Sequence, residues 1–105
     1  MRDVALVYAL YPDHASALEA ARAMVERRLA ACANIFAAGR SVYRWEGEVK
    51  DEDEVPVLFK TMADQVQALT AALADAHPYD LPAILSWPAA ASDAYARWVD
   101  AETVR

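Results

Sequence analysis

The chain has 105 residues, 57% of them hydrophobic, and a formal net charge of -6. This length predicts one domain, residues 1–105, with a single hydrophobic core, and the apolar content excludes a disordered chain. The negative charge argues against a nucleic acid or an anionic membrane as a partner, because both would be repelled.

The first predicted element is a strand at residues 4–11, which form a continuous apolar run. The run is too short for a typical helix, so we expect a central strand that is buried on both faces. A helix is predicted over about residues 14–30, because apolar residues recur there every three or four positions and charged residues take the opposite face. Asp13 or Ser16 can cap its start.

The middle of the chain predicts a long hairpin that begins near Cys32, bends near residues 37–39 and returns through residues 50–61. The alternation of an extended chain puts Tyr43 and Trp45 on one face of its first half. A strand face with two aromatic side chains is expected to be covered by a helix or by another copy of the chain.

Proline marks the second half of that hairpin. Pro56 has no N–H group to donate to a sheet ladder. The part of the strand around Pro56 is therefore expected at an edge, at a bulge or beyond the main sheet.

The last third of the chain predicts a helix over residues 62–76, where apolar residues recur at spacings of three and four. A short strand is predicted at residues 83–87 and is expected to end at Pro88. Ser92 or Asp93 can then cap a terminal helix of one or two turns.

The order of these elements predicts the α+β class with a ferredoxin-like split βαβ sandwich. Its parts are a four-stranded antiparallel sheet, two helices on one face and an extra short helix at the C-terminus. This topology leaves the other sheet face uncovered. Because the strands are apolar on both faces, self-association is expected to cover it.

Several features indicate a cytoplasmic protein. No stretch approaches the ~18 apolar residues that a membrane span needs, and residues 1–3 lead into a strand rather than a signal peptide. The single cysteine cannot form an internal disulfide, which agrees with a reducing compartment. We therefore expect neither a membrane nor a nucleic acid among its partners.

Cys32 and the two histidines, His14 and His77, are the candidate metal ligands. A thiolate suits copper or zinc, but a small buried residue at a helix-to-strand junction is the favoured interpretation of Cys32. His77 and His14 fall at one end of the predicted sheet, and Cys32 starts a strand at the other end. A strand of six residues spans ~20 Å, so Cys32 and His77 can share a metal only between subunits. The alternative for the histidines is a surface His14 and a His77 that hydrogen-bonds its own turn.

The acidic residues 46–54 could attract hard cations. They lack the glycine and the ligand spacing of a calcium loop, so a solvated hairpin end is the favoured interpretation. The sequence also has no Ser/His/Asp pattern, no Gly-rich phosphate loop and no zinc motif, and we expect no enzyme.

Four stretches of the sequence resemble the CutA divalent-cation tolerance proteins, and the resemblance covers nearly the whole chain. They are RLAAC at residues 28–32 with Asn34–Ile35, SVYRWEG at 41–47, LFKT at 58–61 and HPYDLP at 77–82. The resemblance implies a tight homotrimer, with strands that pair across subunits and a cleft at each interface. It links the chain to tolerance of copper and other divalent cations, and it implies no catalytic reaction.

Two functions are compatible with this resemblance. The first is a cytoplasmic trimer that binds copper or another divalent cation, with His77 as the first expected ligand and Cys32 as the second. The alternative is a signalling trimer, similar in architecture to the PII proteins, that holds a small metabolite in the intersubunit cleft and acts on a protein partner. Polar and aromatic members of the matching motifs would line that cleft or simply pack the seam. They are Asn34, Tyr43, Trp45, Lys60 and Tyr79.

The sequence departs from the family pattern at three places. Ala37–Ala38, followed by Gly39, replaces the usual Pro-Gly pair of the bend, which changes the expected turn. Ala83 stands where a glutamate is common. Ala9 and Ala76 occupy positions where some relatives carry Cys and His.

Overall fold

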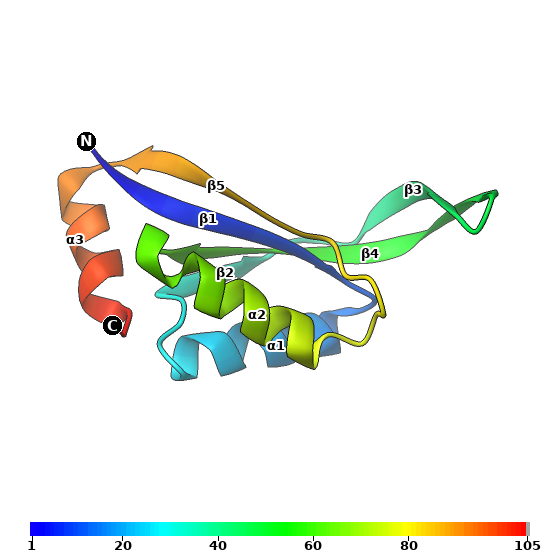
Figure 1. Cartoon of the computed structure of the whole chain (residues 1–105), viewed down its shortest axis with the longest axis horizontal. Helices are drawn as coiled ribbons and strands as arrows, with labels where there is room; N and C mark the ends of the chain where they lie inside the picture. Colours follow the sequence, from blue (N-terminus) through cyan, green and yellow to red (C-terminus); the bar gives the residue numbers. More distant parts are fainter. Residues whose placement is uncertain (105) are drawn as a thin grey trace.

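The computed structural model describes residues 1–104 and places helices and strands in the predicted order (Figure 1). The strands are β1 (Arg2–Tyr11), β2 (Cys32–Ile35), β3 (Gly39–Trp45), β4 (Glu48–Thr61) and β5 (Ile84–Ala91). The helices are α1 (His14–Glu26), α2 (Val66–Ala76) with a 3-10 turn before it (Ala63–Gln65), and α3 (Asp93–Glu102).

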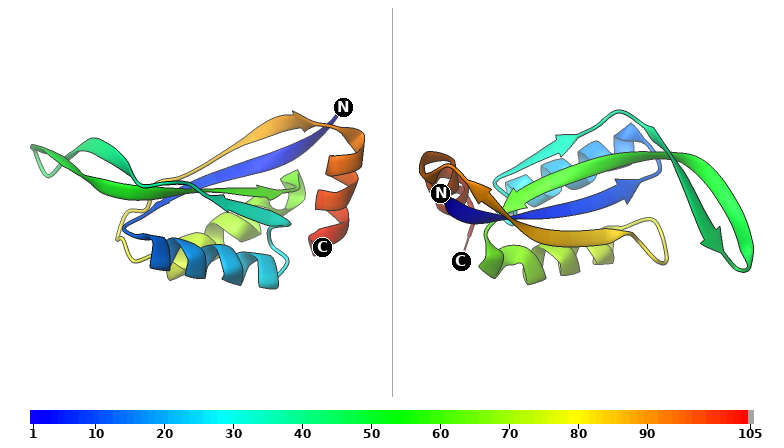
Figure 2. Two further views of the ribbon diagram at one scale, coloured as in Figure 1. Left: turned by 180° about the vertical axis from the view of Figure 1, so that it is seen from behind. Right: turned by 90° about the horizontal axis from the view of Figure 1, so that it is seen from above.

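The sheet has the order β2-β4-β1-β5, and each of its paired strands is antiparallel. Helices α1 and α2 lie side by side against one face, and α3 stands across one end of the sheet (Figure 1). The α+β ferredoxin-like prediction is therefore confirmed. Strand β3 pairs only with the first half of β4, and the two strands project from the body as an arm (Figure 2).

The core lies between the sheet and the two helices. Val7, Ala9 and Tyr11 of β1 are buried there, and the intervening side chains of β1 point to the opposite face. The helices add mainly alanine and leucine, which allows them to approach the sheet closely. Central residues of this cluster are Ala17, Met24, Val57, Phe59, Leu69 and Leu73. The expected burial of β1 on both faces is thus complete only on the helical side.

The arm is closed by a two-residue turn between Trp45 and Glu48. Glu46 and Gly47 have φ angles of 50° and 79°, the pattern of a type I′ hairpin turn. Gly47 suits this position because it has no Cβ to oppose a positive φ.

Pro56 lies at the break between the two partners of β4. Strand β2 ends at Ile35, opposite Val57, and β3 begins at Gly39, opposite Glu54. The Pro56 carbonyl accepts a hydrogen bond of 2.9 Å from the Phe36 N–H group. On its other side Pro56 is paired with Leu10 in the ladder with β1, so the expected position at an edge, at a bulge or beyond the main sheet is wrong for that side and holds only on the side where β2 ends and β3 begins.

Two predicted ends are wrong. Helix α1 stops at Glu26 rather than near residue 30, since Arg28 adopts a left-handed backbone with φ of 61°. Strand β5 continues through Pro88 to residue 91, because a proline is tolerated in an edge strand.

Helix α3 is also longer than the predicted one or two turns. It has 10 residues and the expected cap, in which Ser92 Oγ accepts a hydrogen bond from the Tyr95 N–H group. The Arg28 guanidinium donates to the carbonyl groups of Ala101 and Glu102, at 2.8 and 3.2 Å. This contact between distant segments ties the end of α1 to the end of α3.

Candidate functional site

The sheet face opposite α1 and α2 carries a continuous apolar surface. Directly paired residues of antiparallel strands share a face, so Tyr8 lies between Leu58 and Leu85, and Leu6 lies between Lys60 and Trp87. Leu85 is 55% exposed although its side chain is entirely apolar. We call this surface the open face. An exposed apolar surface of this kind marks an interaction site.

Three predicted site residues meet on the open face. Cys32 is paired with Lys60 in the register of β2 and β4, and the Lys60 ammonium group donates a hydrogen bond to the Asn34 side-chain oxygen. The Cys32 sulfur lies 3.4 Å from the Tyr95 hydroxyl of α3. Burial, together with this hydrogen bond, raises the pKa of Tyr95 to about 12. Tyr95 was not among the predicted site residues, because only the docking of α3 brings it to Cys32.

His77 lies beside the end of β1, away from the open face residues. One ring nitrogen, Nε2, is 2.7 Å from the Leu10 carbonyl, and the other, Nδ1, accepts a hydrogen bond of 3.1 Å from the Tyr79 N–H group. These partners assign the proton to Nε2 of a neutral ring. The ring also stacks on Tyr11 with centroids 4.5 Å apart. Both nitrogens are therefore engaged in the turn.

These contacts predict that His77 stabilises the fold. The His77→Ala variant should lose about 2 kcal/mol of unfolding free energy, because it leaves the Leu10 carbonyl and the Tyr79 N–H group without partners. Denaturant unfolding at a fixed protein concentration measures the loss. His14→Ala is the matched control, since His14 is exposed at the start of α1 and should change stability by less than about 0.5 kcal/mol. Equal losses in the two variants would contradict this role.

A second group of polar side chains lies along the arm. The Tyr43 hydroxyl donates a 2.8 Å hydrogen bond to Glu52, which raises the pKa of Tyr43. Burial, followed by a hydrogen bond with Glu54, raises the pKa of Tyr79 well above its usual range. Glu54 itself is only 7% exposed. The interpretation of the acidic stretch as uniformly solvated is therefore wrong for Glu54, whose sequence signal was only its place before the apolar run of β4.

The remaining predicted residues lie apart from these groups. Trp45 is at the tip of the arm, beside the hairpin turn. His14 begins α1, next to Asp13, whose pKa is lowered chiefly by the hydrogen bond from the Ser16 backbone. The five predicted cleft residues thus occupy three places in one chain. A cleft that contains all five requires more than one copy.

The candidate metal ligands are not gathered into one site within residues 1–104. Within residues 1–104, no group of three or more His, Cys, Asp or Glu side chains is arranged to hold one. Cys32 is paired with Lys60 of β4, whereas His77 contacts Leu10, which is paired with Pro56 of the same strand. Lys60 and Pro56 are four residues apart, so the positions of Cys32 and His77 are separated by about 13 Å along β4.

These observations define a class: a ferredoxin-like α+β protein with one helical face, one open apolar face and a projecting two-stranded arm. In the described part of the chain, none of the helices has the length and apolar character to span a membrane. Residues 5–102 match the family described as CutA1 divalent ion tolerance protein. The chain belongs to this family, which confirms the resemblance found in its motifs.

Relatives and solved structures agree with this membership. The divalent-cation tolerance protein CutA of Pectobacterium atrosepticum is 37% identical over 100 residues, which cover 94% of this chain and 91% of that protein. The structure of divalent ion tolerance protein CutA1 from Ehrlichia chaffeensis matches with a TM-score of 0.92 and 37% identity, over 100% of this chain and 99% of that one. CutA from Xylella fastidiosa matches with a TM-score of 0.94 and 34% identity, over 98% and 100% of the two chains.

Proposed function

We propose that this chain acts in the cytoplasm as a homotrimer that binds a divalent metal ion, with copper first, and that it catalyses no reaction. Its family is named for tolerance of divalent ions and not for a reaction, which supports metal tolerance as the general role. A free Cys32 is compatible with a reducing compartment.

The open face is the observation that carries this proposal. Leu85 and Trp87 are exposed apolar residues on an edge strand, and they adjoin the half-buried Leu6 and Tyr8 of β1. Burial of a leucine side chain contributes about 1.5–3 kcal/mol, so several such residues favour association strongly. The family resemblance supports three copies as the number.

We propose a metal site that is shared between subunits, because the candidate ligands in residues 1–104 of one subunit are not gathered into one site. Cys32 becomes the first proposed ligand and His77 the second, in the reverse of the order expected from the sequence. The Cys32 sulfur lies on the open face near Tyr95, where neighbouring copies would meet. His77 would have to give up a hydrogen bond within its own turn before it could bind a metal.

Calorimetric titration of the wild-type protein with Cu²⁺, Zn²⁺ and Cd²⁺ under anaerobic conditions tests this assignment. Cys32→Ser should weaken binding at least about tenfold, because even the loss of a group that only orients a ligand has an effect of this size. His14→Gln should bind as the wild type does and serves as the control. If Cys32→Ser and His77→Gln both retain wild-type affinity, the metal assignment fails at these residues.

A small-metabolite function is the second candidate. The buried carboxylate of Glu54, with Tyr79 and Tyr43 nearby, offers convergent polar groups on an aromatic wall, as small-ligand sites often do. A bound metabolite seen by native mass spectrometry, and lost in Glu54→Gln, would favour this function over metal binding.

A further inference from the structure

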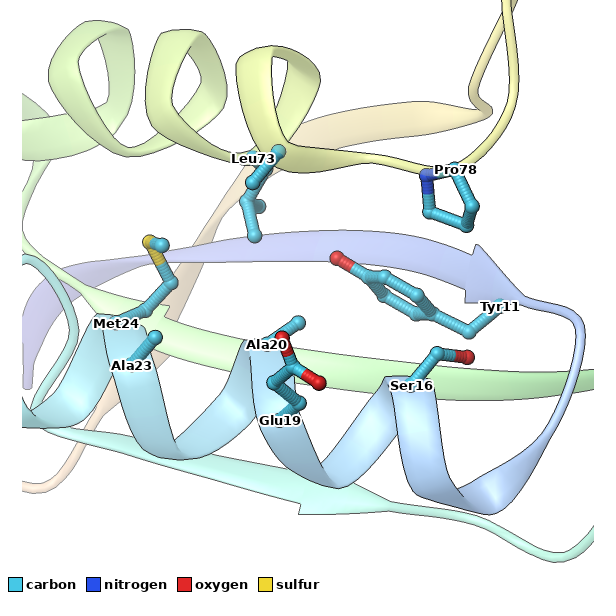
Figure 3. Close-up of a pocket in the computed structure, with 9 residues that line it drawn as sticks. Tyr11, Ser16, Glu19, Ala20, Ala23, Met24, Leu73 and Pro78 are labelled. Atoms are coloured by element: carbon cyan, nitrogen blue, oxygen red, sulfur yellow. The ribbon is translucent and has the colours of Figure 1, made fainter.

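A cavity of about 270 Å³ lies between α1 and α2, beneath the end of β1 (Figure 3). It belongs to the helical layer, on the opposite side of the sheet from the open face. Assembly through the open face would therefore leave the cavity accessible. An apolar cavity of about 150 Å³ is enough to hold benzene, so this one has room for a larger small molecule.

The cavity has polar groups toward one end and Met24 at the other. Figure 3 shows Ser16 and the Tyr11 side chain toward the first end and Met24 toward the second, with Glu19 of α1 and Leu73 of α2 between them. The Ser16 hydroxyl is already engaged, because it donates a 2.8 Å hydrogen bond to Asp13. The polar groups available to a ligand are therefore the Glu19 carboxylate and the Tyr11 hydroxyl.

Tyr11 is the second observation that points to a ligand. Its side chain belongs to the core and only 2% of the residue is exposed, yet its hydroxyl is directed into the space between the helices (Figure 3). Within residues 1–104 no group hydrogen-bonds the Tyr11 hydroxyl, and because no buried side-chain polar atom there lacks a partner, this hydroxyl is accessible from the cavity. Burial raises the pKa of Tyr11 to about 12, so the hydroxyl stays neutral at physiological pH.

Glu19 determines the charge of the ligand. It is the charged side chain of the cavity lining, and it makes no ion pair within the described chain. A carboxylate without a partner favours a cation, and a phenol oxygen can accept a hydrogen bond from the same cationic group. Met24 and Leu73 offer apolar contacts to a hydrocarbon tail.

We propose that this cavity binds a small amphipathic ammonium compound, with its cationic head between Glu19 and the Tyr11 hydroxyl and its apolar tail against Met24 and Leu73. The ligand class follows from the two ends of the cavity, and it does not depend on the metal site or on the number of subunits. The binding energy comes from burial of the tail, and the polar end selects the charge of the head.

The experiment is a titration of the full chain with n-hexylammonium, followed by methyl and amide NMR. Saturable shifts in the millimolar range are expected at Ala23 and Leu73. Glu19→Gln and Tyr11→Phe should each weaken binding about threefold, the effect of one exposed ion pair or one hydrogen bond. Ala23→Leu, which fills the apolar end, should abolish it. Glu26→Gln removes another exposed carboxylate of α1 and should leave binding unchanged.

Hexanoate and 1-hexanol separate charge selection from simple apolar binding. Hexanoate should not bind, and 1-hexanol should bind about as weakly as hexylammonium binds to Glu19→Gln. Equal affinity for hexanoate and hexylammonium, or retained binding in Ala23→Leu, would overturn the proposal. The absence of any shift in the wild-type protein when hexylammonium is added would also overturn the proposal.

Discussion

Leu85→Glu is expected to separate the proposed homotrimer into monomers at micromolar concentration. Leu85 of the edge strand β5 is paired with Tyr8 on the open face, where a neighbouring copy would bury it. A carboxylate buried there without a partner opposes association by several kcal/mol at each interface, so the dissociation constant should rise at least about 100-fold. Sedimentation equilibrium of the wild type and the variant measures the change.

Leu18→Glu is the matched control for this experiment. Leu18 is 49% exposed, close to the 55% of Leu85, but it belongs to α1 on the helical side of the sheet. It should therefore leave the assembly intact. A wild-type monomer, or a Leu85→Glu variant that sediments as the wild type does, would contradict the proposed use of the open face.

Phe59→Ala is expected to have the largest effect on stability, a loss of about 3–5 kcal/mol of unfolding free energy. Phe59 is fully buried near the C-terminal end of β4, two residues before the strand ends, opposite Val7 of β1 and Ala33 of β2. Truncation removes a large aromatic side chain from a core built mostly of alanine, valine and leucine. Neighbouring side chains of that size cannot collapse into the space without shifts of the helices.

Guanidinium unfolding at one protein concentration measures this loss. Val42→Ala provides the comparison, because Val42 is an exposed residue of the arm and its truncation should cost less than about 1 kcal/mol. A Phe59→Ala variant that unfolds at nearly the same midpoint as Val42→Ala would show that the core is not organised around β4.

Much of the site could be predicted from local pattern, because a strand period of two determines which residues share a face. Cys32, Asn34 and Lys60 were recognised as members of the motifs, and the structure places them together on the open face. The engagement of both His77 nitrogens could not be predicted, since one of its partners, Leu10, is 67 residues away. For the same reason Glu54 looked like part of a solvated acidic run until Tyr79 was placed beside it.

The sequence by itself determined the class of the fold and the order of its elements. Periodicity is a property of a few neighbouring residues, so it can be read without knowing what packs against them. Tertiary structure alone decided the left-handed turn at Arg28 after α1, the contact of Cys32 with Tyr95 and the amphipathic cavity beside Tyr11. Each of these depends on the docking of segments that are distant in sequence, and periodicity carries no information about how such segments meet.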